Sequence, residues 1–377
     1  MRSRRAGFLL AVAALATACS SAPAEPAAPS PAPVSPSSSA AAQDSFTVVA
    51  TGDVLIHPAL TDQAKSDAKQ TGKGEFDYRP LLAGVKPLIS GADLAICHLE
   101  TPLAPEGGPY SGYPSFSAPP EIADAIKDTG YDTCSTASNH TLDQGEAGIK
   151  RTLDKLDAAG LDHTGSARSA KEAATPLIMD VHGVKVAQIS FAFGFNGIEV
   201  PAGKPWLANR IVVDDVIAAA KAAKKAGAEV VIASLHWGLE YQHEITADQR
   251  DQAKKLLADA SIDLIVGHHA HVVQPFEEIN GKWVAYGLGN SVAKHDEPRG
   301  STEEGAAARF RFTHTASGWK VDKAEYVPTL IQLAPQLRLL DLTTSAPTLR
   351  GAEALKATDE VVLSRGAGKD GLTRPGQ

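Results

Sequence analysis

The sequence predicts an α/β protein whose functional side chains gather where its strands end. Apolar, β-branched runs alternate with helical stretches along the chain, which is the pattern of an α/β sheet. Several of these runs end in a carboxylate, a carboxamide or an imidazole, most clearly at His236 and in the GHHAH segment 267–271. Open α/β sheets place their binding sites outside the carboxyl ends of the strands. We therefore expect one site at this edge of the sheet.

The histidines at the ends of two neighbouring runs indicate a metal site. His236 ends the run that begins at residue 230, and His268, His269 and His271 fall within four residues. Neutral imidazole is the commonest metal ligand in proteins. A rigid strand aims such a ligand, and the loop that follows leaves room for a substrate. Ordinary loop histidines are the alternative, which this clustering disfavours.

Composition excludes several classes of protein. The 377 residues suffice for a large core, and 43% hydrophobic with 21% charged residues is typical of a soluble globular body. The net charge is −8 and no basic block is interleaved with aromatic residues, so nucleic acid is not an expected partner. Three cysteines are too few for a disulfide framework.

The N-terminal residues 1–18 read as a signal peptide. Arg2, Arg4 and Arg5 precede an apolar stretch, 7–18, that is too short to span a bilayer. Small residues before Cys19 resemble a bacterial lipoprotein cleavage site, which predicts a lipidated Cys19 on the outer face of the cell membrane. Secretion with an unmodified cysteine is the alternative. Residues 19–44 are rich in Ser, Ala and Pro and are predicted to form an extended tether.

Residues 45–341 are predicted to form one folded domain. Strands are expected at 46–51, 93–97, 131–135, 177–180, 184–191, 283–286, 308–313 and 319–326, besides the two strands that end in histidine. Helices are expected at 79–89, from Pro119 onward, near 143–159, from an N-cap at Asp214 to 226, and at 247–260. Turns at His182-Gly183 and Asn280-Gly281 indicate hairpins. Strands 308–313 and 319–326 are expected at the outer edge of the sheet, and residues 342–377 as a loosely ordered tail.

The residues at the strand ends have the chemistry of a transition-metal site. They are Asp53, Glu100, Asn139, His140, His236, His269 and His271. Carboxylate, carboxamide and imidazole together suit a divalent ion of the zinc, manganese or iron kind.

Six motifs in order resemble the CapA family of poly-gamma-glutamate capsule synthesis proteins, within the calcineurin-like metallophosphatase superfamily. They are GDVLIH (52–57), HLET (98–101), SNHTLDQG (138–145), HWGLEY (236–241), GHHAHVVQ (267–274) and YGLGN (286–290). The resemblance covers about residues 46–330 and implies a four-layer α/β/β/α sandwich. It also implies a role in synthesis, release or anchoring of an extracellular polymer such as poly-gamma-glutamate, through a metal-dependent hydrolase-like site. The alternatives are a secreted phosphoesterase or nucleotidase, and a polymer-binding module without turnover. Family members often work beside membrane-bound ligase subunits.

Carried over by position, the resemblance implies a centre of one or two ions. Asp53 would bind the first ion, Glu100 would bridge both, Asn139 and His236 would bind the second, and His269 and His271 would each bind one. His140 would act as a general acid oriented by Asp143. Asn290 is expected to support the site from behind, and His268 could be either a ligand or a supporting residue.

The sequence departs from the superfamily pattern at two positions. Leu55 stands where a phosphatase carries a histidine, and the bridging residue is Glu100 rather than an aspartate. His57 could compensate for Leu55, or it could be a turn residue. Without that imidazole, we expect one tightly held ion and a second that is weakly held or absent.

Two further pairs have open roles. Cys97 and Cys134 are expected as small buried side chains rather than as a disulfide. Glu240 and His243 could line the pocket or belong to a solvated loop.

Overall fold

The computed structural model describes residues 44–376. The predicted signal peptide, Cys19 and the tether up to residue 43 lie outside the described residues. No helix in 44–376 is long and apolar enough to cross a membrane. The helices are α1 Pro58–Thr71, α2 Arg79–Leu82, α3 Lys86–Ser90, α4 Glu121–Thr129, α5 Gly145–Ala159, α6 Ala170–Ala173, α7 Val213–Lys225, α8 Ala247–Ala258 and α9 Leu349–Val362, with short 3-10 turns at Pro205–Leu207 and Ser301–Glu303.

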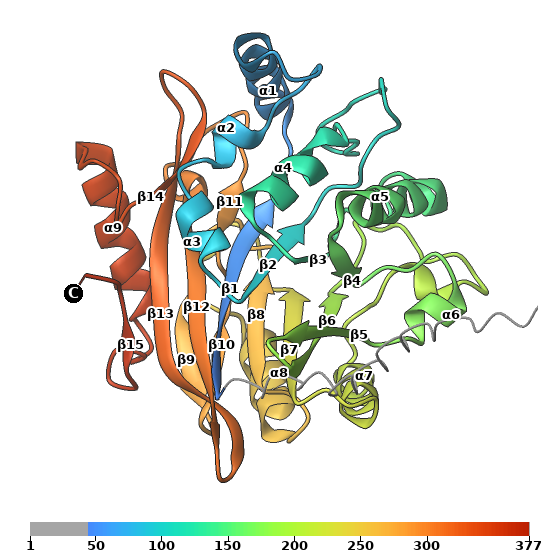
Figure 1. Ribbon diagram of the computed structural model, residues 1–377, viewed down its shortest axis with the longest axis vertical. Helices are drawn as coiled ribbons and strands as arrows, with labels where there is room; N and C mark the ends of the chain where they lie inside the picture. Colours follow the sequence, from blue (N-terminus) through green and yellow to red (C-terminus); the bar gives the residue numbers. More distant parts are fainter. Residues whose placement is uncertain (1–43, 377) are drawn as a thin grey trace, which may run out of the picture. The chain divides into compact units, whose positions relative to one another are not determined.

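The strands form two sheets (Figure 1). The first has the order β14-β13-β12-β1-β2-β3-β4, with β11 beside β1 and β15 beside β13. The second has the order β5-β6-β7-β8-β10-β9. The strands of the first are β1 Ser45–Val54, β2 Leu94–Leu99, β3 Thr133–Ser135, β4 Asp162–Thr164, β11 Asn290–Val292, β12 Glu304–Thr315, β13 Gly318–Gln332, β14 Arg338–Asp341 and β15 Leu372–Thr373. Those of the second are β5 Leu177–Val181, β6 Val184–Ala192, β7 Val230–His236, β8 Leu264–His268, β9 Phe276–Ile279 and β10 Lys282–Ala285.

The two sheets pack face to face, and helices cover the outer face of each. Side chains alternate between faces along a strand. In β1, Val49 therefore packs against helices α1 to α5, whereas Val48 and Ala50 point toward the second sheet. In β7, Ile232 points toward the first sheet and Val231 packs against α7 and α8. These alternating contacts confirm the four-layer α/β/β/α sandwich.

The carboxyl ends of β1, β2, β3, β7 and β8 lie at the same edge, as the sequence predicts. Within the first sheet β1 is parallel to β2 and β2 to β3, and within the second β7 is parallel to β8. Gly52 allows the segment before β11 to approach β1 closely. A Cβ atom there would lie 2.0 Å from the Gly289 carbonyl oxygen. The Asp53 amide donates a 2.9 Å hydrogen bond to that same oxygen. This contact fixes the position of the Asp53 backbone, from which the carboxylate extends.

Two helix predictions need correction, and one helix was missed. The expected helix 79–89 consists of two short helices, α2 and α3, because the chain turns at residues 83–85. Asp214 does not cap α7: the helix begins at Val213, and Asp214 lies in its first turn. Helix α1 was not expected, since its apolar positions are few and small.

The prediction that 308–313 and 319–326 form the sheet edge is wrong. The corresponding strands are β12, which lies between β1 and β13, and β13, which is flanked by β12, β14 and β15. Two strands after residue 337, β14 and β15, cover one edge of β13, and they are too short to give a strand signal in the sequence.

The expectation of a loosely ordered tail at 342–377 is also wrong. Helix α9 begins at a cap in which the Thr348 hydroxyl accepts a hydrogen bond from the Gly351 amide. Its residues Ala354 and Val362 are buried. Tyr326 of β13 donates a 2.8 Å hydrogen bond to Asp359 of the helix. A helix with few large apolar residues is fixed here by packing rather than by sequence pattern.

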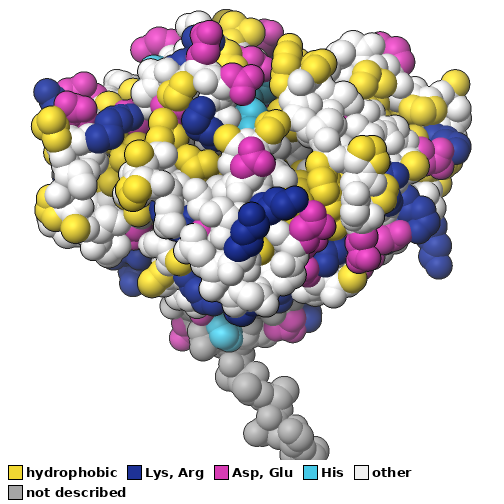
Figure 2. Space-filling model, turned by 90° about the horizontal axis from the view of Figure 1, so that it is seen from above, with side chains coloured by type: hydrophobic (Ala, Val, Ile, Leu, Met, Phe, Trp, Pro, Cys, Tyr) yellow, Lys and Arg dark blue, Asp and Glu magenta, His cyan; other side chains and the backbone are white. Residues whose placement is uncertain are grey.

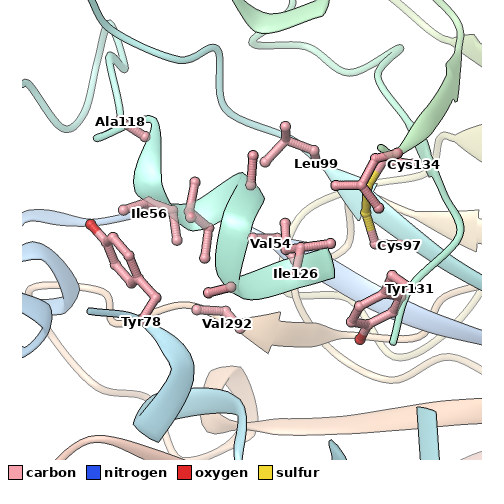
Figure 3. Packing of buried hydrophobic residues seen from close by; sticks show 14 of the residues in the cluster. Val54, Ile56, Tyr78, Cys97, Leu99, Ala118, Ile126, Tyr131, Cys134 and Val292 are labelled. Atoms are coloured by element: carbon pink, nitrogen blue, oxygen red, sulfur yellow. A yellow bond between two sulfur atoms is a disulfide. The ribbon is translucent and has the colours of Figure 1, made fainter. Parts of the chain in front are cut away.

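Cys97 and Cys134 form a disulfide, contrary to the expectation of two free thiols (Figure 3). They are paired neighbours on the parallel strands β2 and β3, and their Cα atoms are 4.5 Å apart. That separation is within the range of a disulfide. The bond lies on the face of the first sheet that packs against the helices, on the same side of the view as Tyr131 (Figure 3).

Candidate metal centre

The residues predicted from the strand ends lie together between the two sheets. Asp53 is near the end of β1, Glu100 follows β2, Asn139 follows β3, His236 ends β7, and His269 and His271 follow β8. None of the six side chains is more than 4% exposed. Figure 2 views the molecule from above and shows histidine in a hollow on this face, among hydrophobic and acidic side chains.

Two groups of possible metal ligands share Glu100. The first is Asp53, Glu100 and His271, and the second is Glu100, His236 and His269. Within each group the ligand atoms lie within 4.8 Å of one another. These are the two sets that the resemblance implied, apart from Asn139. The Asn139 Oδ1 atom joins the second set, at 3.0 Å from His236 Nε2.

The polar atoms of this cluster suit a divalent cation. Both carboxylate oxygens of Glu100 are buried and have no hydrogen-bond partner among the described residues, and neither does Nδ1 of His269. A buried carboxylate without a donor is costly unless a cation or a proton neutralises it. Carboxylate oxygens with imidazole nitrogens are a normal ligand set for zinc, manganese or iron. The donor set therefore fits the metal that the resemblance implies.

Charge is unevenly distributed over the cluster. Burial opposes the charged form of Asp53, but hydrogen bonds with His268 and His271 hold the pKa of Asp53 well below its usual value. Burial, aided by the nearby Asp53 charge, holds the pKa of Glu100 well above its usual value. Burial also opposes the charged form of His271, but Glu100 and Asp53 raise the pKa of His271 to about 9. Burial lowers the pKa of His269 to about 3, so this imidazole is neutral and has a free lone pair.

The loop that carries His269 and His271 has an unusual backbone. The φ angles are +93° at His269 and +55° at His271, in the left-handed region that residues other than glycine rarely adopt. Such conformations cluster at functional sites, where the surrounding structure holds them in place. Here the His269 amide donates a 3.2 Å hydrogen bond to the Asp53 carboxylate.

His98 is a buried neighbour of the centre that the sequence reasoning missed. Its Nε2 lies 3.0 Å from Nδ1 of His236, and its Nδ1 lies 2.8 Å from the Ser135 hydroxyl oxygen. The signal was present in HLET, because residues two apart on a strand share a face and Glu100 is two residues beyond His98. Burial lowers the pKa of both His98 and His236 well below the usual value, so both rings are neutral.

His268 lies between His98 and Asp53, next to the metal centre. Its ring stacks on that of His98 with centroids 4.1 Å apart, and its Nδ1 lies 3.4 Å from Asp53 Oδ1. Together with Asp53 and His98 it forms a further group of possible ligands.

His140 and Asp143 lie in contact beside the centre. His140 Nδ1 is 2.7 Å from Asp143 Oδ2, which also accepts a hydrogen bond from the Phe116 amide. Both side chains are buried, and His140 lines a cavity of about 220 Å³ at the mouth of the centre. Glu240, Tyr241 and other residues line the same cavity. Glu240 is exposed and forms another group of possible ligands with His269 and His271.

The remaining predicted residues have supporting positions. The structure places Asn290 Oδ1 3.0 Å from His271 Nδ1, and Asn290 Nδ2 donates to the Thr302 carbonyl. His243 Nδ1 lies 2.8 Å from the carbonyl of Val273, in the loop after the HxH segment, and His243 is not among the residues that line the cavity.

Neither Leu55 nor His57 supplies the imidazole missing from the superfamily pattern. Leu55 is buried against Phe116 and Ala293. His57 precedes α1, and its ring contacts Phe116 and His295. It belongs to none of the groups of possible ligands found among the described residues.

A four-layer α/β/β/α sandwich with carboxylates and imidazoles at its strand ends defines a metallophosphatase-like protein. Within that class, residues 47–295 match the family described as "Bacterial capsule synthesis protein PGA_cap". The match covers more than half of the chain, and the chain belongs to this family.

Curated relatives share part of this chain. The capsule biosynthesis protein CapA of Bacillus anthracis is 35% identical over 180 residues, which are 47% of this chain and 44% of that protein. The PGA biosynthesis protein CapA of Bacillus subtilis is 30% identical over 52% of this chain and 51% of its own length. The chain thus spans about half the length of these two relatives. A probable polyglutamine synthesis accessory protein of Mycobacterium tuberculosis is 28% identical over 76% of each chain.

Solved structures with a similar chain path include a calcineurin-like phosphoesterase, YfkN, from Bacillus subtilis. It is 16% identical and aligns over 84% of this chain and 97% of that chain, with a TM-score of 0.45. A novel phosphatase from Mycoplasma pneumoniae is 14% identical over 76% and 94% of the two chains, also with a TM-score of 0.45.

Proposed function

We propose that this protein acts outside the cytoplasm in the synthesis, release or anchoring of a capsule-type anionic polymer such as poly-gamma-glutamate. Its centre would hold one or two divalent metal ions and support hydrolysis. The family match and the CapA relatives support the polymer. The cluster of carboxylates and imidazoles supports the metal.

One observation carries this proposal: Glu100 is shared by two groups of ligand atoms, and both of its oxygens are buried without a hydrogen-bond partner. A carboxylate in this position can bridge two cations. A core built for packing alone would not bury an unpaired carboxylate beside Asp53 and several imidazoles.

The residues around the centre can assist hydrolysis. A bound divalent ion lowers the pKa of a water ligand and stabilises negative charge in the transition state. Asp53, Glu100 and His271 would hold one ion, and Glu100, Asn139, His236 and His269 the other. His140 faces the cavity, and its ring is oriented by Asp143, so it can give a proton to a leaving group.

The location rests on two features. The sequence before residue 44 resembles a lipoprotein signal followed by a tether. The disulfide between Cys97 and Cys134 supports an oxidising compartment, because such bonds are rare in the cytosol. Membrane-bound polymer-synthesis subunits are proposed partners.

The test is hydrolysis by the purified full chain loaded with manganese or zinc. Two substrates are compared: poly-gamma-glutamate, followed by chain length, and bis(p-nitrophenyl) phosphate, followed by absorbance. Glu100→Gln serves as the inactive control. Metal-dependent shortening of the polymer supports the proposal.

Other outcomes favour the alternatives. Rapid turnover of the phosphodiester with an intact polymer would identify a phosphoesterase. Metal binding with polymer binding and no cleavage would identify a binding module. A chain that binds neither metal nor polymer would overturn all three.

A further inference from the structure

A buried row of polar side chains runs from β3 to the candidate metal centre, and the function proposed above does not use it. Ser135 Oγ is 2.8 Å from His98 Nδ1, and His98 Nε2 is 3.0 Å from His236 Nδ1. His236 Nε2 is in turn 3.0 Å from Asn139 Oδ1. None of these four side chains is more than 2% exposed, so water cannot replace any of their partners.

Two orders of donors are compatible with these distances, because the Ser135 hydroxyl lies 2.8 Å from His98 Nδ1 and 3.3 Å from the Cys97 carbonyl and can donate to either. A cation at the centre selects the order in which Ser135 donates to Cys97 and accepts from Nδ1–H of His98. A neutral imidazole carries one N–H, so Nε2 of His98 then has a lone pair and accepts from Nδ1–H of His236. His236 then keeps its lone pair on Nε2, which faces the centre.

This order leaves two lone-pair atoms facing each other. His236 Nε2 and the Asn139 carboxamide oxygen lie 3.0 Å apart with no hydrogen between them. Such a pair is stable beside a cation, which both atoms can bind. The opposite order, from Ser135 through His98 and His236 to Asn139, would place a hydrogen on Nε2 and close that nitrogen to a metal. Each ring holds one proton in either order, so only the proton positions differ.

We propose that His98 and Ser135 are positioning residues that hold His236 in the Nδ1–H tautomer, with Nε2 free to bind a divalent cation. The inference rests on the proposed metal centre. Metal-binding histidines commonly donate their other N–H to a carboxylate, a carbonyl or water, and such partners affect metal affinity 10- to 100-fold. Here the partner is a second imidazole, and the serine of the neighbouring strand accepts the Nδ1–H of that imidazole. His98 and Ser135 are paired across β2 and β3, so the disulfide one residue earlier holds both in register.

The test compares two substitutions at residue 98 in the full chain. Glutamine in His98→Gln presents an acceptor oxygen near the position of Nε2, whereas leucine in His98→Leu presents none. The exposed His314 gives the control, His314→Leu. Affinity is measured by calorimetry with Mn²⁺, and coordination by the visible spectrum of bound Co²⁺.

The proposal predicts that His98→Leu weakens Mn²⁺ binding about 10- to 100-fold and changes the Co²⁺ spectrum. His98→Gln should restore binding to within about threefold of the parent, which a role in packing alone would not explain. Parent-like binding by His98→Leu would overturn the proposal.

A second measurement needs no substitution. In ¹⁵N-histidine-labelled protein loaded with diamagnetic Zn²⁺, nitrogen shifts identify the protonated nitrogen of each ring. We expect Nδ1–H for both His98 and His236, and Nε2–H for His98 would overturn the proposal. If the parent protein does not bind metal at all, the proposed function is contradicted. Failure of the proposed function is therefore distinguishable from failure of the tautomer proposal.

Discussion

At the scale of single residues, the site depends on how buried charges neutralise one another. Asp53 and Glu100 lie beside His271, whose Nδ1 is 3.1 Å from Asp53 and whose Nε2 is 3.7 Å from Glu100. A positive imidazole between two carboxylates partly replaces the charge that a cation would supply. Metal and proton therefore compete for the same position.

This competition predicts that metal binding releases protons. With a pKa of about 9, His271 is protonated at pH 7 in the metal-free protein and must lose that proton to become a ligand. Mn²⁺ affinity should rise about tenfold per pH unit between pH 6 and pH 8 from the His271 proton alone and level off above pH 9, and the rise should be steeper wherever Glu100, whose pKa is raised by burial, also carries a proton. Calorimetry in two buffers with different ionisation enthalpies counts the protons. Binding at pH 7 without proton release would contradict this assignment.

The pair His140 and Asp143 predicts a kinetic effect without loss of metal. His140→Ala should lower kcat for any substrate that the parent hydrolyses by about 10²- to 10⁴-fold, because a general acid contributes on that scale. Asp143→Asn should have a smaller effect, since it disturbs only the orientation of the ring. Metal content, measured by mass spectrometry, should remain that of the parent. Unchanged kcat in His140→Ala would remove His140 from the mechanism.

Most residues of the site were predictable because each lies at or just after the end of a strand, and parallel strands deliver their ends to one edge. Asp53, Glu100, Asn139, His236, His269 and His271 all have this signal. His98 also lies near the end of its strand, but the ligand set that the resemblance implies does not include it, and it acts through His236. Its position becomes clear only when β2 and β7 face each other across the two sheets.

At the scale of elements, the disulfide joins two strands that carry residues of the centre. Cys97 and Cys134 directly precede His98 and Ser135 and lie a few residues before Glu100 and Asn139. Two cysteines in separate predicted strands do not reveal whether those strands are neighbours or in register. The disulfide therefore depends on the parallel pairing of β2 with β3, which places the two cysteines opposite each other.

Removing this bond should destabilise the fold. For a sequence separation of 37 residues, the loop-entropy relation gives about 4 kcal/mol for Cys97→Ala with Cys134→Ala. Urea unfolding of the full chain measures this difference. Two reactive thiols from Cys97 and Cys134 in unreduced, denatured parent protein would show that the bond is absent.

The elements predicted best were those with strong periodicity or clear turns. The hairpins at His182-Gly183 and Asn280-Gly281 are present, as are the strands that end at His236 and near His268. Helix α9 and strands β14 and β15 were missed. Their sequences carry little apolar periodicity. Strands β14 and β15 are fixed by hydrogen bonds to the edge of β13 that faces away from β12.

At the scale of the whole molecule, the four layers follow from the alternation of side chains in β1 and β7, and the family follows from motifs at the strand ends. The proposed location rests on the sequence before residue 44 and on the disulfide between Cys97 and Cys134.

We predict that Cys19 is lipidated and that the mature chain is held at the outer face of the cell membrane. Changing Cys19→Ala should release the protein into the medium or leave its signal peptide uncleaved. Cell fractionation with a high-salt wash measures the distribution. A variant that remains in the membrane fraction like the parent would contradict the lipid anchor.

The central claim is that Glu100 joins two unequal metal positions. Calorimetric titration of the metal-free full chain with Mn²⁺ tests it most directly, with Glu100→Gln and Asp53→Asn beside the parent. The parent should show one tight step, with Asn139, His236, His269 and Glu100 as ligands, and one weak step, because Leu55 supplies no imidazole to the other position. Asp53→Asn should remove only the weak step, and Glu100→Gln should weaken both. Two equally tight steps in the parent, or two unchanged steps in Glu100→Gln, would contradict the account.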